Sequence, residues 1–134
     1  MMNRRKAREY AFILLFEYRF QPDEIRQILE DFFAENEAGD QESYIRQAVE
    51  GAVSHVQEID ALIAEYAKSW SVERISIASM AIMRLAVYEM KYIESIPLNV
   101  SVNEAVALAK IYDGDEAAPF VNGILGNLKK SLEK

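Results

Sequence analysis

Apolar residues recur along the chain at the three- and four-residue spacing of amphipathic helices. The first such stripe runs from Ala7 to Tyr18, and residues spaced in this way lie on one face of a helix. A second, shorter stripe begins after Asp23 and ends in a polar loop at residues 35–40. The third stripe covers residues 42–68, where the pattern predicts one continuous helix.

The second half of the chain continues the helical pattern. The segment Ile77–Tyr92 is apolar almost all round, which is typical of a helix with neighbours on several sides. Ser101 and Glu104 have the spacing of a capping box, so the next helix is predicted to begin at Ser101 and to run to about Tyr112. An Asp-Gly-Asp turn then leads to a last helix starting at Ala118.

Breaks between these segments are marked by residues that interrupt helices. Pro22 is expected to end the first helix or open the second, and Trp70 breaks the long third stripe before a single turn at residues 72–75. We find no alternating apolar and polar run of useful length, which excludes a substantial sheet. The sequence therefore predicts an all-α, single-domain bundle of six or seven helices over residues 1–134.

The amino-acid composition excludes several kinds of catalytic and metal site. The chain has no cysteine and one histidine, so disulfides, thiolate zinc sites and cysteine nucleophiles are excluded, and no catalytic set or cofactor is indicated. The loop at residues 113–116 lacks the offsets of a calcium loop, and we expect no metal. Apolar runs fall short of the roughly 18 residues of a membrane span, and no signal peptide is evident. We expect a soluble, cytoplasmic protein.

The net charge of −7 is unevenly distributed. Residues 1–20 carry five basic and two acidic side chains, whereas residues 21–60 carry two basic and eleven acidic ones. Lys129 and Lys130 add positive charge near the other end. A local basic patch is what phosphate contact requires, whatever the total charge. The alternative interpretation is a solubilising tail.

The first helix carries a second group of residues opposite its core stripe. Arg5, Arg8, Phe12 and Phe16 fall within about 80° of arc on that side. Arginine donates to phosphate, and aromatic rings stack on bases or anchor a partner protein. Alternatively the helix is central and packed on both faces, which would explain the phenylalanines better than the arginines.

Three further features stand out in apolar surroundings. Arg84 and Glu89 lie inside the apolar segment Ile77–Tyr92, where a charge needs a partner, either within the protein or on another molecule. Asn122 and Gly123 interrupt the apolar last segment. The structural interpretation is that Gly123 allows another helix to approach closely. The functional interpretation is that the Asn122 amide forms hydrogen bonds with a base or a phosphate.

Four of these segments, in their order, resemble the NusB family of bacterial transcription antitermination factors. They are Arg-Arg-Lys-Ala-Arg-Glu at residues 4–9, Arg-Leu-Ala-Val-Tyr-Glu at 84–89, Ile-Pro at 96–97 with Val-Asn-Glu-Ala-Val-Ala-Leu-Ala-Lys at 102–110, and Phe-Val-Asn-Gly-Ile-Leu at 120–125. The resemblance spans nearly the whole chain, and the last block is its most specific part.

The resemblance implies an all-helical protein that catalyses no reaction. It would bind the boxA element of nascent ribosomal RNA transcripts together with NusE, a ribosomal small-subunit protein. The pair would join other Nus factors and RNA polymerase to oppose premature termination. Some members of the family form a homodimer that hides the RNA surface, while others are monomers.

The same resemblance assigns roles to individual residues. RNA contacts are expected from Arg4, Arg5, Lys6, Arg8, Phe120 and Asn122. Contacts with NusE are expected from Phe16, Arg84, Tyr88 and Glu89, with Glu89 paired to a basic side chain of that partner. The chain departs from some relatives at Phe16, where they have tyrosine, and at Gly126, where they have aspartate.

Two other functions compete with this one. The same helical domain resembles the N-terminal part of some ribosomal RNA methyltransferases, but 134 residues leave no room for a catalytic domain and contain no Gly-rich cofactor loop. A bundle that only binds other proteins, with an incidental basic tail, is the second alternative.

Overall fold

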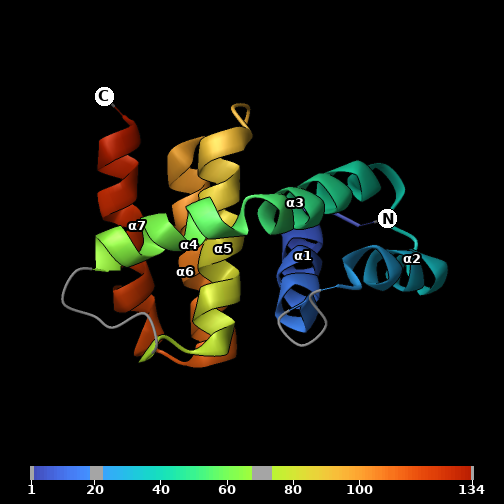
Figure 1. Ribbon diagram of the computed structural model, residues 1–134, viewed down its shortest axis with the longest axis horizontal. Helices are drawn as coiled ribbons and strands as arrows, with labels where there is room; N and C mark the ends of the chain where they lie inside the picture. Colours follow the sequence, from blue (N-terminus) through green and yellow to red (C-terminus); the bar gives the residue numbers. More distant parts are fainter. Residues whose placement is uncertain (1, 19–22, 68–73, 134) are drawn as a thin grey trace.

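The computed structural model describes residues 2–18, 23–67 and 74–133, and these parts form seven α-helices and one short 3-10 helix (Figure 1). The helices are α1 Arg4–Tyr18, α2 Ile25–Glu35, α3 Glu42–Ser54, α4 Val56–Ala67, α5 Ile77–Tyr92, α6 Leu98–Asp113 and α7 Ala117–Leu132, with the 3-10 helix at Gly39–Gln41. The predicted all-α class and the number of helices are confirmed.

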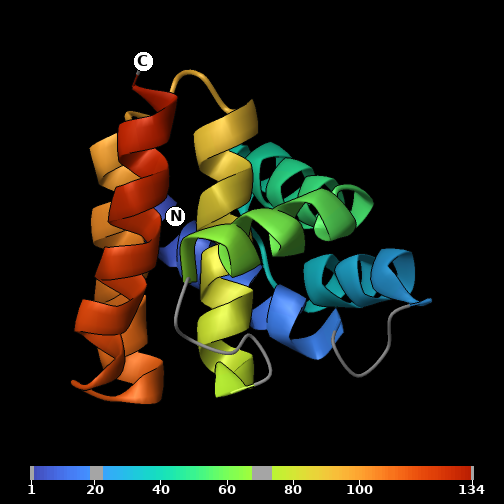
Figure 2. The ribbon, with the colours of Figure 1, turned by 60° about the vertical axis from the view of Figure 1, so that its left-hand side comes forward.

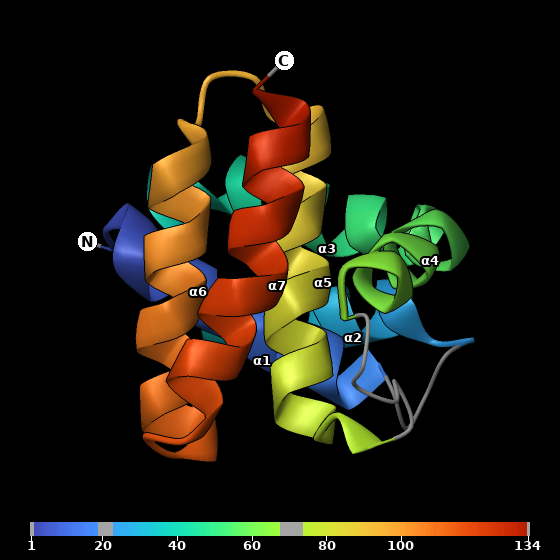
Figure 3. The same cartoon turned by 90° about the vertical axis from the view of Figure 1, so that its left-hand side faces the viewer.

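The three long helices of the second half form one layer of the molecule. Helices α5, α6 and α7 stand side by side, with α1 behind them (Figure 3). Helix α4 crosses this layer, in contact with α5 and α7, while α2 and α3 lie at the other side of the molecule (Figures 1 and 2). None of the described helices is both long enough and apolar enough to cross a bilayer.

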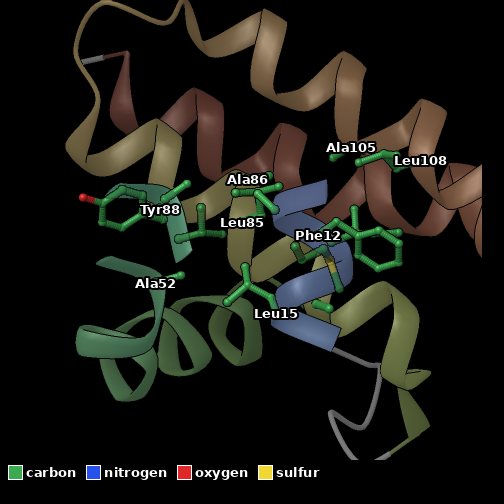
Figure 4. Close-up of a cluster of buried hydrophobic side chains, with 14 of the residues drawn as sticks. Phe12, Leu15, Ala52, Leu85, Ala86, Tyr88, Ala105 and Leu108 are labelled. Atoms are coloured by element: carbon green, nitrogen blue, oxygen red, sulfur yellow. The ribbon is translucent and has the colours of Figure 1, made fainter. Parts of the chain in front are cut away.

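Helix α1 is packed on more than one face. Its predicted core stripe is buried, with Ala7 and Ala11 fully inaccessible to solvent. Phe12, on the other side, is only 3% exposed and belongs to the same buried cluster as Leu85 of α5 and Leu108 of α6 (Figure 4). The interpretation of α1 as a central helix therefore holds for Phe12.

The continuous helix predicted for residues 42–68 is wrong, because the chain bends at His55. This residue leaves the helical conformation, with φ −111° and ψ 22°, and separates α3 from α4. Helix α3 packs on α1 and α5, whereas α4 packs on α5 and α7. Both helices have an apolar stripe, and the spacing of apolar residues continues without a break across the bend. The bend therefore leaves no mark in the hydrophobic pattern, and it is set by the different helices against which α3 and α4 pack.

The predicted capping box at Ser101 is also wrong. Helix α6 begins one turn earlier, directly after Pro97, whose carbonyl accepts from the N–H of Val100 at 3.0 Å. Proline fixes φ near the helical value and so permits an early start. Ser101 and Glu104 consequently lie inside the helix, where their side chains are available for contacts with other helices.

Other predicted boundaries agree with the structure. Helix α5 is capped by Ser76, whose Oγ accepts from the N–H of Ser79 at 3.0 Å. The turn after α6 is made at Gly114, whose φ of +93° favours glycine, and α7 begins one residue before the predicted start. The breaks predicted at Pro22 and Trp70 lie outside the described residues.

A close approach to glycine occurs at Gly51 and not at Gly123. A Cβ atom on Gly51 of α3 would overlap the ring of Tyr88, which lies on α5. A Cβ atom on Gly123 would meet nothing within 4 Å. The prediction of a close helix contact at Gly123 is therefore wrong, and the close contact at Gly51 lies between α3 and α5.

Gly51→Ala should destabilise the protein by about 1–3 kcal/mol, because the Tyr88 ring must move to make room for the added methyl group. The matched control is Gly123→Ala, which adds the same group in open space within α7. That variant should be more stable than the wild type by up to about 1 kcal/mol through helix propensity. Urea unfolding measures both, and equal effects at the two sites would contradict the packing described.

Candidate nucleic-acid interface

The first turn of α1 presents three basic side chains to solvent. Asn3 caps this helix, since its Oδ1 accepts from the backbone N–H of Lys6 at 2.8 Å. Arg4, Arg5 and Lys6 follow directly and are all exposed. Three adjacent cations at one helix end form a compact positive patch in an otherwise acidic chain.

Each of these exposed cations contacts an acceptor of the protein itself. Arg4 Nε donates to Gln41 Oε1 at 2.7 Å, and Lys6 Nζ lies 3.1 Å from Glu9 Oε1. Arg5 makes a bidentate contact with Glu104 of α6, with Nε 3.1 Å from Oε1 and Nη2 2.8 Å from Oε2. The side-chain directions of Arg4 and Arg5 are therefore set by residues far away in sequence, whereas Lys6 pairs within α1.

Arg8, one turn further on, points into the protein. Its side chain is 7% exposed, and its Nε donates to Oε2 of the fully buried Glu89 at 2.8 Å. Tyr44 of α3 donates its hydroxyl to the same carboxylate oxygen, and Ser101 of α6 donates to Oε1 at 2.7 Å. The Glu89 carboxylate thus joins α5 to α1, α3 and α6.

Two predicted contacts are corrected by this geometry. Arg8 does not offer its guanidinium to RNA, because the group is buried and bonded to Glu89. Glu89 does not offer its carboxylate to a partner protein, because the group is completely inaccessible and already has three donors. A buried charge is tolerated when it is paired and hydrogen-bonded, and these two residues satisfy each other.

Electrostatics follow the same contacts. Burial alone would lower the pKa of Arg8, but the hydrogen bond and charge of Glu89 outweigh it and raise that pKa above its ordinary value. Burial, together with the negative charge of Glu89, raises the pKa of the Tyr44 hydroxyl. The hydrogen bond from Arg5 lowers the pKa of Glu104. All of these groups keep their usual charge at neutral pH.

The two α7 residues assigned to RNA line different hollows. Half-buried Phe120 borders a pocket of about 430 Å³ between the start of α5 and the start of α7. Exposed Asn122 borders a groove of about 280 Å³ between α6 and α7, whose lining includes Asn103, Lys129 and Lys130. Asn103 directly precedes the Glu104 that contacts Arg5, so α6 contributes adjacent residues to this groove and to the basic turn.

Three of the four residues predicted to contact NusE lie on α5, and two of them, Arg84 and Tyr88, contact residues near α3 and α4. Arg84 makes a bidentate ion pair with Asp60 of α4, at 2.8 and 2.9 Å, which agrees with the interpretation of an internal partner for this charge. Tyr88 stacks on Tyr92, and Tyr92 stacks on His55 with ring centroids 4.4 Å apart. Tyr92 is 36% exposed, so this stack ends at the surface.

Phe16 belongs to α1 and packs near the ring of Phe12, at a centroid distance of 6.4 Å. The other end of this aromatic group is Tyr112 of α6, whose ring centroid is 4.8 Å from that of Phe12. Tyr112 also donates its hydroxyl to Glu9. Sequence patterns did not single out Tyr112 or Gln41, because neither breaks the local hydrophobic pattern.

Comparison with known proteins places this arrangement in a family. A model of the NusB family matches residues 5–130. The chain belongs to the NusB family. The transcription antitermination protein NusB of Thermoanaerobacter sp. (strain X514) is 42% identical over 125 residues, covering 93% of this chain and 89% of the relative. The NusB of Bacillus subtilis (strain 168) is 38% identical over 133 residues, covering 99% of both.

Solved NusB structures share the fold. T. maritima NusB superposes with a TM-score of 0.88 at 35% identity, over 96% of this chain and 92% of that one. A crystal structure of antitermination factors NusB and NusE in complex with dsRNA matches with a TM-score of 0.80 at 27% identity, over 96% of each chain. The resemblance found in the sequence is confirmed for the NusB family and its all-α fold.

Glu89→Gln should destabilise this NusB-family protein by about 3–5 kcal/mol, because it removes the counter-charge of the buried Arg8. The same change at Glu133, whose pair with Lys129 is exposed, should cost less than about 1 kcal/mol. Urea unfolding of both variants tests this difference. A small effect at Glu89 would show that Arg8 finds another partner or reaches solvent.

The contact between Arg5 and Glu104 should make the free energy of unfolding depend on pH in the acidic range. The pKa of Glu104 lies below its ordinary value of 4.5, so the pair stabilises the fold above that value and is lost as pH falls through the lowered pKa. The difference in unfolding free energy between the wild type and Glu104→Gln should therefore be constant near neutral pH and shrink in acid. A difference independent of pH would contradict this pairing.

Proposed function

We propose that this protein is a transcription antitermination factor that binds boxA RNA through the first turn of α1, together with NusE. The proposal is carried by one observation, the exposed cluster of Arg4, Arg5 and Lys6 on a chain of the NusB family. Because the chain as a whole is acidic, its net charge would not attract RNA, and any electrostatic attraction must come from this local patch. The family supplies the RNA element and the partner as hypotheses to test.

The three cations would neutralise phosphates, and the α7 residues would contact bases. Guanidinium groups and ammonium groups bind the backbone without reading its sequence. Phe120 borders a pocket wide enough for part of a nucleotide, where its ring would stack on a base. Asn122 would donate or accept along the groove between α6 and α7. Arg8 would act indirectly, by fixing the orientation of α1.

The partner surface would include the half-buried residues of the predicted set, Phe16 and Arg84, as candidate contacts with NusE. Tyr88 is buried, with 7% of its surface exposed, and would contribute to that surface through Tyr92, the exposed residue on which it stacks. Glu89 would support this surface from beneath. Its buried carboxylate joins α5 to α1, α3 and α6.

The proposed assembly includes other Nus factors and RNA polymerase, acts in the cytoplasm and catalyses no reaction. Residues 1–134 would act as one RNA-binding domain, without a cofactor. RNA binding requires a form in which the first turn of α1 is uncovered, either a monomer or a homodimer that has opened.

The decisive experiment is a titration of the protein onto boxA RNA and onto a scrambled RNA, with and without NusE, at two salt concentrations. Preference for boxA that increases with NusE supports the proposal. Equal weak binding to both RNAs without a response to NusE would favour a bundle that binds other proteins. RNA preference without a response to NusE would retain the RNA face and reject the partner surface.

Arg5→Ala should weaken boxA binding by about threefold to tenfold and reduce the slope of log affinity against log salt by about one. The reason is the loss of one cation from an exposed patch of three. The matched control is Lys91→Ala, which removes one charge at the end of α5, where Lys91 pairs with Glu58. Equal salt slopes for Arg5→Ala and the wild type would contradict the assignment of Arg5.

A further inference from the structure

The guanidinium of Arg5 is already bound to a carboxylate in the same two-pronged geometry that it would use for a phosphate. Its Nε and Nη2 lie 3.1 and 2.8 Å from the two oxygens of Glu104. Arginine forms this bidentate contact with carboxylates and phosphates alike. A phosphate arriving at these two donors must therefore displace Glu104.

The two members of the pair differ in exposure. The Arg5 side chain is 76% exposed, whereas the Glu104 side chain is 17% exposed and lies inside α6. The arginine is thus the end that can swing toward a ligand, while the carboxylate stays in place. An exposed pair of this kind contributes little to stability, and Glu104 does not cap its helix.

A second cation stands beside Glu104. Arg8 Nη1 lies 3.7 Å from Glu104 Oε1, on the inner side of the carboxylate. When Arg5 leaves, Glu104 retains this neighbour as a counter-charge, so the exchange does not leave a half-buried carboxylate without a partner. The neighbouring pairs differ, since Arg4 contacts a neutral amide and Lys6 contacts an acid on its own helix.

We propose that Glu104 is an internal competitor for the RNA phosphate at Arg5 and thereby limits the RNA affinity of the free protein. The proposal rests on the proposed RNA-binding function and adds a residue that acts against it. Binding at Arg5 is then an exchange of one anion for another.

The test is boxA affinity at low salt for the wild type, Glu104→Gln, Arg5→Ala and the double variant. Glutamine keeps the size of the side chain and removes its charge. Glu104→Gln should bind about threefold to tenfold more tightly than the wild type. The gain should disappear in the Arg5→Ala background, because it acts through that guanidinium.

The matched control is Glu58→Gln, which changes net charge equally but frees Lys91 at the end of α5. It should leave boxA affinity within about twofold of the wild type. Thermal unfolding of every variant reports the folded fraction, and the comparison of Arg5→Ala with the double variant cancels any structural loss caused by the glutamine itself.

The possible outcomes distinguish a failure of the competitor role of Glu104 from a failure of the proposed RNA-binding function. Unchanged or weaker binding by Glu104→Gln overturns the competitor, and weaker binding would identify Glu104 as a residue that positions Arg5. A gain that persists without Arg5, or that Glu58→Gln reproduces, also overturns it, since net charge would then be the cause. If the wild type does not prefer boxA with or without NusE, the proposed function itself fails.

Discussion

The buried ion pair between Arg8 and Glu89 is the contact on which the arrangement of the α1, α3, α5 and α6 helices depends. Removing two charges from water is costly, so the pair persists only because its remaining hydrogen-bonding capacity is used. Tyr44 and Ser101 donate the remaining hydrogen bonds to the Glu89 carboxylate and thereby connect it to α3 and α6. A shift or rotation of α1 would separate the charges inside the core, and this fixes the register of that helix.

The fixed register determines which cations of α1 reach solvent. With Arg8 turned inward, Arg4, Arg5 and Lys6 occupy the exposed first turn. Arg4 contacts Gln41 ahead of α3, and Arg5 contacts Glu104 of α6. The candidate RNA face is consequently built by three elements, although its charge comes from consecutive residues of one helix. Losing the buried pair would disturb the face without removing any of its cations.

A net charge of −7 is compatible with RNA binding because the relevant field is local. Acidic side chains are placed directly against two of the three exposed cations, at Glu104 and Glu9. Affinity would then be tuned by contacts within the protein as well as by contacts with the RNA.

The sequence by itself determined the helical class, most helix positions and the location of positive charge, because hydrophobic spacing and charge are local properties. It also identified Arg84 and Glu89 as charges in need of partners, but it could not supply those partners. Asp60 and Arg8 are brought to them by helix packing. The comparisons confirm the NusB family to which the sequence pointed, yet three of the residues that the resemblance assigned to contacts, Arg8, Tyr88 and Glu89, are buried.

Only the tertiary structure decided the bend at His55, the early start of α6 and the inward direction of Arg8. In each case the local pattern is satisfied by two arrangements. The apolar stripe over residues 42–68 fits one long helix or two helices joined by a bend. Ser101 and Glu104 have the spacing of a helix cap, but within a helix they can instead contact other helices, as they do here. An arginine beside phenylalanines, such as Arg8, fits either an exposed surface or an interior in which its charge is paired. The choice is made by what packs against the segment, which depends on residues far away along the chain.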